Sequence, residues 1–286
     1  MSRTYIGLHI PKCAGTSLLR MAKENLPVHQ FYQNTSIIMN WRDRRPEFLD
    51  IQDYESLKLV WGHSVHEQML HYLTNPVLFT GMRDPVERLV SEAQYQVDLR
   101  QRQGIPFDMQ AWLGRQKNPM TWFIINRFPM LADRKNNSLT PFERAQKALQ
   151  AFSHVYFTDS FAASANSLLS ELGVSCGVKE ANKGARKDIK VDVNLSNLKY
   201  DIALYEWARS EFSDSDPCAK TGDNDYLSGF LASSRQTQEL ESFLFNSMAG
   251  EYQAWGTLEE VLGDRLTQAM RILREVDVYG KRLAEK

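Results

Sequence analysis

The sequence has few cysteines, no long hydrophobic run and no excess of either charge, and each shortage excludes a class of protein. Its 286 residues include three cysteines, Cys13, Cys176 and Cys218. Three is too few, and an odd number, for a disulfide framework, and it fits a reducing compartment. No apolar run approaches the roughly 18 residues that span a membrane, and the first residues lack a signal-peptide layout. We therefore expect a cytoplasmic protein that does not insert into membranes.

The charges nearly cancel, with 34 basic residues against 35 acidic ones and a formal net charge of −1. Proteins that bind nucleic acid usually carry a basic excess, so no nucleic-acid partner is expected. Hydrophobic residues at 43% and charged residues at 24% are typical of a soluble globular enzyme. This composition excludes a mainly disordered chain, a collagenous repeat and a coiled-coil rod.

Short apolar segments alternate with longer helical patterns, which predicts an α/β fold with a parallel sheet. The expected strands are Thr4–Ile10, Leu57–Trp61, Pro76–Thr80 and His154–Thr158. We expect one domain over residues 1–286, with a core of about 4–212. Residues 213–286 form a mostly helical C-terminal extension in this prediction, after a polar loop at 213–225, and the extension is a candidate for acceptor specificity.

Local signals place several helices. Thr16 or Ser17 is the expected cap of a helix that runs towards Asn25. Asp84-Pro85-Val86-Glu87 and Thr140-Pro141-Phe142-Glu143 each carry a cap residue, a proline at the first helical position and a glutamate at the third. Two further helices are predicted over 160–172, ending at Gly173, and over 201–212.

The segment His9–Ser17 has the features of an anion site. A strand ends, a short loop turns at Gly15, and a helix begins with Thr16 and Ser17. Backbone N–H groups and the positive end of the helix dipole then point at one place. Lys12 adds a full charge, although the G-x-x-x-x-G-K-[ST] pattern is not present. A chance strand-to-helix turn has the same residues, so this segment alone leaves both interpretations open.

A second segment, Val77–Ser91, adds an arginine and a serine. A buried strand delivers Arg83 to the edge of the sheet where open α/β folds bind ligands. The following helix carries Ser91, and an arginine fork with a hydroxyl suits a phosphate group. The alternatives are an ion pair from Arg83 to Asp84 or Glu87, and a helix hydroxyl satisfied within the helix.

Together these two motifs resemble those of the PAPS-dependent sulfotransferases, in the branch that includes the Golgi carbohydrate O-sulfotransferases and their bacterial relatives. The resemblance covers about residues 4–212, including Asn182-Lys183 in the basic segment 179–190 and the stretch that begins at Asp201. It implies a P-loop-like doubly wound sheet flanked by helices. It also implies 3′-phosphoadenosine 5′-phosphosulfate (PAPS) as co-substrate and PAP as product.

The resemblance further implies the role of individual residues. The residues expected at the 5′ end of the co-substrate are Lys12, Ala14, Gly15, Thr16 and Ser17. Arg83 and Ser91 are expected at its 3′-phosphate, with Lys183 as a further contact. Cys13 stands where a small or hydroxyl residue is common in this family. It either packs inside the loop or, beside Lys12 and a helix N-terminus, is a reactive thiol.

Transfer to a hydroxyl needs a base that takes its proton, and His63 is the best placed of six histidines. It follows the strand 57–61 across Gly62, and this Gly-His step resembles the catalytic histidine region of the glycan uronyl sulfotransferases. A structural role for His63 is the alternative, with Glu67 or an acidic residue of 92–108 as a reserve base. The spacing of His63 and His66 matches no metal-binding pattern, so no metal site is expected.

The predicted reaction is sulfuryl transfer from PAPS to the hydroxyl of a carbohydrate or small metabolite, with His63 and Lys12 as catalytic residues. The sulfuryl group carries less negative charge than a phosphoryl group, which weakens the demand for magnesium. Two alternatives are a small-molecule kinase that uses ATP and magnesium, and a nucleotide-binding protein without turnover. Trp41, Trp112 and Trp122 either line an acceptor site or lie in the core.

Overall fold

The structure is a computed structural model that describes residues 3–27, 30–34, 56–73, 75–174, 192–212 and 225–235. The chain divides into two units, residues 1–231 and residues 232–286, and every element named below begins in the first. Within the described ranges, no helix combines the length and the apolar character that crossing a bilayer would need.

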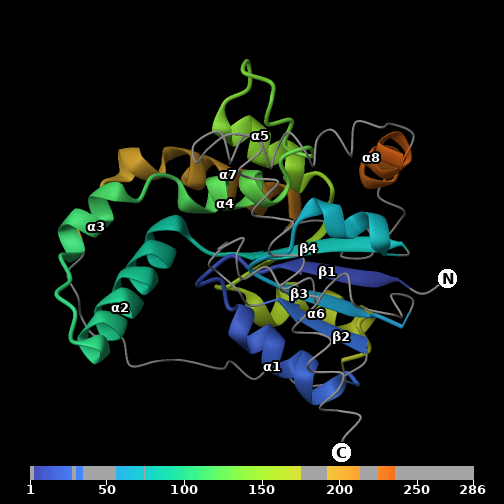
Figure 1. The fold of residues 1–286 in the computed structure, drawn as a ribbon, viewed down its shortest axis with the longest axis horizontal. Coiled ribbons are helices and arrows are strands. Elements are labelled where there is room, and N and C mark those ends of the chain that lie inside the picture. The colour runs from blue at the N-terminus through green and yellow to red at the C-terminus, as the bar shows by residue number, and fades with distance from the viewer. Residues whose placement is uncertain are drawn as a thin grey trace, which may run out of the picture. The chain divides into compact units, whose positions relative to one another are not determined.

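The described residues form a five-stranded parallel sheet with the order β2-β3-β1-β4-β5 (Figure 1). The strands are β1 Thr4–Leu8, β2 Phe31–Asn34, β3 Leu59–Gly62, β4 Pro76–Met82 and β5 Phe152–Phe157. The four predicted strands are confirmed, with ends that differ by one or two residues. The sequence analysis missed β2, because two of its four residues are polar and its pairing with β3 is a tertiary contact. The predicted parallel α/β class is confirmed.

Helices connect and follow these strands. They are α1 Gly15–Asn25, α2 Pro85–Gln103, α3 Met109–Arg115, α4 Pro119–Arg127, α5 Pro141–Leu149, α6 Phe161–Glu171, α7 Lys199–Phe212 and α8 Asp225–Arg235, with the short 3₁₀ helices η4 Glu67–Tyr72 and η5 Leu195–Leu198. The predicted helices are confirmed, whereas α3 and α4 were not predicted. Residues 213–224 and 236–286 of the expected C-terminal extension lie outside the described residues.

The caps at the helix starts follow the sequence signals at two of three places. Asp84 accepts from the backbone N–H groups of Val86 and Glu87, and Thr140 forms a full capping box with Glu143. The prediction for α1 was wrong: the helix begins at Gly15, and its N-cap is Ala14 rather than Thr16 or Ser17. The chain leaves β1 at Leu8 and turns earlier than the apolar run to Ile10 suggested.

The strands alternate side chains between two apolar layers, so the fold is doubly wound. Ile6 and Leu8 belong to a cluster that includes side chains of α4, α5 and α7. Tyr5 belongs to a cluster with side chains of α1 and α6 on the other face (Figure 1). Gly7 lies between Trp61 and Phe79, whose rings stack at 5.4 Å across the central strand. A Cβ at Gly7 would clash with both rings, so the stack requires glycine there.

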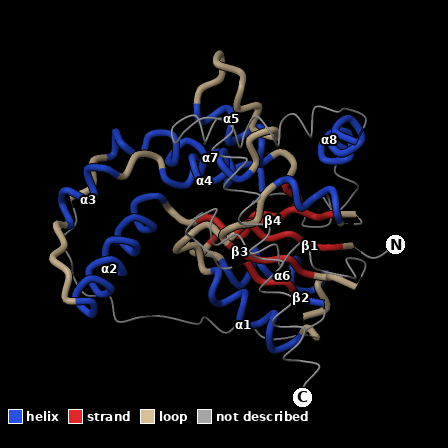
Figure 2. The backbone as a smooth tube through the Cα atoms, viewed as in Figure 1, coloured by secondary structure: helices blue, strands red, loops and turns tan. Residues whose placement is uncertain are grey.

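The sheet order brings three loops together at one edge. Strand β1 lies between β3 and β4, and all three run in the same direction. Their carboxyl ends therefore open onto a common edge, which Figure 2 shows on the side where α2 begins. Ligands of open α/β sheets bind at this edge.

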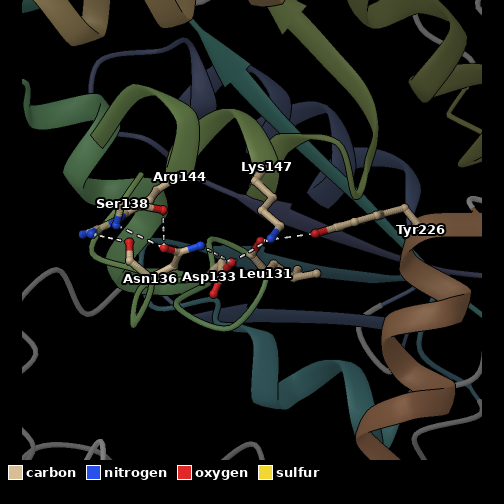
Figure 3. Close-up of polar contacts among 7 residues, drawn as sticks. All are labelled: Leu131, Asp133, Asn136, Ser138, Arg144, Lys147 and Tyr226. Carbon is tan, nitrogen blue, oxygen red and sulfur yellow. Dashed lines mark hydrogen bonds and ion pairs between the residues drawn. The ribbon is translucent and has the colours of Figure 1, made fainter. Parts of the chain in front are cut away.

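A polar network ties α8 to the loop between α4 and α5 (Figure 3). Lys147 of α5 forms an ion pair with Asp133 at 2.8 Å, and Arg144 donates to the carbonyl of Asn136 at 2.7 Å. The hydroxyl of Tyr226, in the first turn of α8, lies 3.5 Å from the carbonyl oxygen of Leu131. The first turn of α8 is thus held on this loop.

Helices α4 and α7 cap each other's first turn, although they lie about 80 positions apart. The buried carboxylate of Asp201 in α7 accepts from the N–H groups of Met120 and Thr121 in α4 at 3.1 and 2.8 Å. In return, the amide oxygen of Asn118, the N-cap of α4, accepts from the N–H groups of Tyr200 and Asp201. Burial raises the pKa of Asp201, and the four N–H donors satisfy both helix ends.

We expect Asp201→Ala to lower the free energy of unfolding by about 1–3 kcal/mol, because it leaves two buried N–H groups without an acceptor. The matched control is Asp108→Ala, which removes an exposed cap of α3 and should cost about 0.5–1 kcal/mol. Urea denaturation of both variants measures the difference. An equal loss in the two variants would contradict the importance of the buried pair.

Candidate active site at the carboxyl edge of the sheet

The loop between β1 and α1 presents the start of a helix to the carboxyl edge. Ala14, the N-cap of α1, has a left-handed backbone with φ of 57° and has no side-chain acceptor for the N–H groups of the first turn. Those N–H groups and the helix dipole together favour an anion. Thr16 is exposed and Ser17 is buried in the same turn. The structure thus groups Ala14, Gly15, Thr16 and Ser17 at one helix end.

The loop folds tightly back over the end of β1. The imidazole of His9 lies so close to Gly15 that a Cβ there would overlap the ring. Glycine is therefore required at this position by space, since Gly15 begins the helix and needs no unusual backbone angle. This is a tertiary reason for the glycine that the sequence motif could not give.

Lys12 lies in this loop with its ammonium group turned toward α2. Its Nζ lies 4.1 Å from the ring centre of Tyr95, an exposed side chain of α2. Burial lowers the pKa of Lys12; Arg83 and Arg88 add to that shift, and the carboxylate of Glu92 opposes it. Two arginines and one carboxylate thus act on Lys12, and the three cations concentrate positive charge around the loop.

Arg83 follows β4 and contacts Glu87 in this structure. Its Nη2 and Nε lie 3.0 and 3.3 Å from the same carboxylate oxygen of Glu87. The ion-pair alternative from the sequence is therefore confirmed in this structure for Glu87. Ser91 lies farther along α2 and is partly buried. Lys183 falls outside the described residues, as does the basic segment around it.

His63 lies just after β3, buried to 9% exposure. Its Nδ1 is 2.6 Å from the carbonyl oxygen of His9. A carbonyl only accepts, so Nδ1 carries the hydrogen and Nε2 keeps its lone pair. Burial is the main cause that lowers the pKa of His63, and Arg127 adds to it, so the imidazole is neutral near pH 7. A neutral ring with Nε2 unprotonated is the form that a general base needs.

His9 holds this ring in place and was missed by sequence reasoning as a functional residue. Its imidazole stacks on His63 at 4.0 Å and on Trp61 at 5.1 Å. Burial, with the charge repulsion of His63 and Lys12, lowers the pKa of His9 to about 3. His9 is therefore neutral and acts through its stacking and its carbonyl. Its place next to the end of a strand was the only signal in the sequence.

Two of the reserve carboxylates have different surroundings. Glu67 is buried and accepts from the backbone N–H groups of Met130 and Leu131, and burial raises its pKa to about 8. These contacts give it a structural role in the loop after α4. Glu92 interacts electrostatically with both Lys12 and His63. Of the acidic residues proposed as alternative bases, Glu92 is the one whose charge acts on both.

Cys13 is fully buried in the loop, and burial raises the pKa of its thiol to about 12. Of the two interpretations from the sequence, the structure supports packing and contradicts a reactive thiolate.

Of the tryptophans, Trp112 packs on a small cluster between α2 and α3, Trp122 is 36% exposed, and Trp41 lies outside the described residues. Among the described residues, no three His, Cys, Asp or Glu side chains group as metal ligands would.

Comparison with known proteins identifies the family. None of the curated proteins matches the chain. A solved structure of a mouse sulfotransferase, SULT7A1 complexed with PAP, aligns with 13% sequence identity and a TM-score of 0.34, and the alignment covers 77% of this chain and 87% of that one. The model of the sulfotransferase family matches residues 4–174, which include β1 to β5, the loop with Lys12, and the residues His63, Arg83 and Ser91. This chain belongs to the sulfotransferase family.

Proposed function

We propose that the chain transfers the sulfuryl group of PAPS to an acceptor hydroxyl and releases PAP. The observation that carries the proposal is the strand order, because β3, β1 and β4 are neighbours and end at one edge. His63, Lys12 and Arg83 follow these strands. Membership of the sulfotransferase family supports the same reaction.

The loop and the first turn of α1 fit the 5′ end of PAPS. The donors there are backbone N–H groups, the ammonium of Lys12 and the hydroxyls of Thr16 and Ser17, which suit a group with several anionic oxygens. Arg83 and Ser91 are proposed for the 3′-phosphate, and Lys183 stays a further predicted contact. Arg83 forms an ion pair with Glu87 in this structure, and the 3′-phosphate is proposed to share or replace that carboxylate.

The chemistry needs a positive charge at one oxygen and a proton acceptor at another. PAPS supplies the sulfuryl group, whose bond to an oxygen of the 5′-phosphate breaks as its bond to the acceptor oxygen forms. The ammonium of Lys12 is proposed to stabilise the charge that develops on the leaving phosphate oxygen. The Nε2 atom of His63 is proposed to take the proton of the acceptor hydroxyl. The bond from Nδ1 to the carbonyl of His9 keeps Nε2 available.

Neither alternative function is favoured by an observation. A kinase would need an acidic residue for magnesium, and the carboxylate of Asp84 instead caps α2. A binding protein without turnover would not need a neutral, oriented histidine beside the proposed anion loop.

The acceptor is proposed to be a carbohydrate or small-metabolite hydroxyl. The cytoplasmic location stays a prediction from the cysteine content.

The first test is nucleotide binding. We expect PAP to raise the melting temperature without divalent metal. At 100 times its dissociation constant, PAP should stabilise the folded state by about 2.7 kcal/mol. AMP, which lacks the 3′-phosphate, should give a smaller shift. A shift with ATP and magnesium but none with PAP would contradict the proposal. Release of PAP from PAPS over a panel of sugars and metabolites then tests transfer and finds the acceptor.

Substitution of Arg83 and substitution of Lys12 should have different effects on PAP binding and on turnover. Arg83→Ala should mainly weaken PAP binding, because its guanidinium contacts the 3′-phosphate in ground state and transition state alike. Lys12→Ala should mainly lower turnover, by about 10²–10³-fold, because its charge acts on the leaving oxygen. Arg20→Ala is the matched control, since Arg20 forms an exposed i,i+4 ion pair with Glu24 that resembles the Arg83–Glu87 pair. Calorimetry and turnover assays separate the two effects, and equal losses of binding with unchanged turnover would refute the division.

His63→Ala should lower turnover by about 10²–10⁴-fold and leave PAP binding nearly intact. Because burial lowers the pKa of His63 from its usual 6.5, wild-type activity should rise with pH below 6.5 as the imidazole loses its proton, and then level off. The variant should lose this limb and regain activity with added imidazole. His66→Ala is the control, with a mild effect. A near-normal His63→Ala enzyme together with an inactive Glu92→Gln enzyme would transfer the role of base to Glu92.

A further inference from the structure

The backbone of Lys12 lies between two carbonyl groups that are each held by a side chain from a distant element. The carbonyl of Pro11 accepts from Nη1 of Arg88 at 3.3 Å, and the carbonyl of Cys13 accepts from the hydroxyl of Tyr156 at 3.1 Å. Arg88 lies in the first turn of α2 and Tyr156 lies in β5. The peptide group that precedes Lys12 and the one that follows Cys13 are therefore held from two different parts of the fold.

This fixation matters because the backbone of the loop is strained. Lys12 has φ of 70° and Ala14 has φ of 57°, both in the left-handed region that residues with a Cβ avoid. Such a conformation costs about 1–2 kcal/mol per residue and persists where surrounding contacts hold it. Arg88 and Tyr156 are 4% and 1% exposed, so both contacts are made inside the packed protein, where side chains have little room to move.

Arg88 also brings a buried positive charge to the loop. Its Nε atom is buried without a hydrogen-bond partner, and its charge acts on the buried carboxylate of Asp201, whose pKa it lowers. Its charge contributes to lowering the pKa of Lys12. A buried cation is costly unless a polar or anionic group compensates it. Here the charge lies beside a loop whose proposed ligand is an anion.

We propose that Arg88 and Tyr156 are positioning residues for sulfuryl transfer, which hold the backbone of Lys12 so that its ammonium group reaches the leaving oxygen. This inference rests on the proposed function and adds two residues to it. We call the pair of contacts, from Arg88 to Pro11 and from Tyr156 to Cys13, the Lys12 clamp. The clamp acts through Lys12, so its energetic effect on turnover must depend on the lysine side chain.

Two conservative variants each remove one hydrogen bond of the clamp and keep most of the side chain. Tyr156→Phe deletes one hydroxyl, and Arg88→Lys keeps the charge but loses the geometry of the guanidinium. Each should lower kcat by about 10–10²-fold, because a small displacement of a catalytic group has effects of that size, while KM for PAPS stays within about threefold. Melting temperatures of the variants report whether the fold is kept, and Tyr156→Phe remains informative if Arg88→Lys does not fold.

Two matched controls lose the same kinds of hydrogen bond elsewhere. Tyr5→Phe removes a hydroxyl that bonds to Glu171 from the first half of β1, and Arg144→Lys weakens the contact to the carbonyl of Asn136 (Figure 3). Both should keep the wild-type kcat. A loss of kcat in these controls as large as in the clamp variants would show that general destabilisation, not the clamp, lowers turnover.

The deciding experiment is a double-mutant cycle with Lys12→Ala. If the clamp acts through Lys12, Tyr156→Phe should cause little further loss of kcat in the Lys12→Ala background. If Tyr156→Phe lowers kcat by the same factor in both backgrounds, or does not lower it in the wild-type background, the clamp is overturned. In either case, PAP binding and sulfuryl transfer by the wild type still uphold the proposed function. A wild-type chain that transfers no sulfuryl group overturns the proposed function and the clamp with it.

Discussion

The turn from β1 into α1 is the constraint on which the site depends. The chain must leave a buried strand at Leu8 and begin a helix at Gly15, with its first N–H groups directed at the edge of the sheet. The left-handed backbones of Lys12 and Ala14 make this possible, and burial of Cys13 fixes the inside of the turn. Because the left-handed backbone of this turn is one that residues with a Cβ avoid, the neighbouring elements must hold it.

The neighbouring elements provide this support in two ways. Arg88 and Tyr156 bond the carbonyls on either side of Lys12, and the ring of His9 covers Gly15. The same His9 supplies the carbonyl that orients His63 and the stacking surface for its ring. One residue, through its ring and its backbone carbonyl, thus connects the proposed anion loop with the proposed base.

Electrostatics at the site contrasts with the balance of the whole chain. The net charge is −1, yet the charges of Arg83 and Arg88 both act on Lys12 at one loop. Glu87 and Glu92 moderate this charge, the first by pairing with Arg83 and the second by opposing the fall in the pKa of Lys12. A local cluster of this kind attracts an anionic nucleotide without making the surface generally basic.

The sequence by itself determined the parallel α/β class and the starts of α2 and α5, and it predicted the residues of the proposed anion loop, because these follow from local alternation, caps and short motifs. It also indicated His63, since a histidine after a strand reaches the carboxyl edge in any parallel sheet. Strand β2, the ion pair of Arg83 with Glu87, the burial of Cys13 and the role of His9 depend on contacts between distant segments. Only the tertiary structure decided them, because a side chain's pKa, tautomer and partners are set by what packs against it.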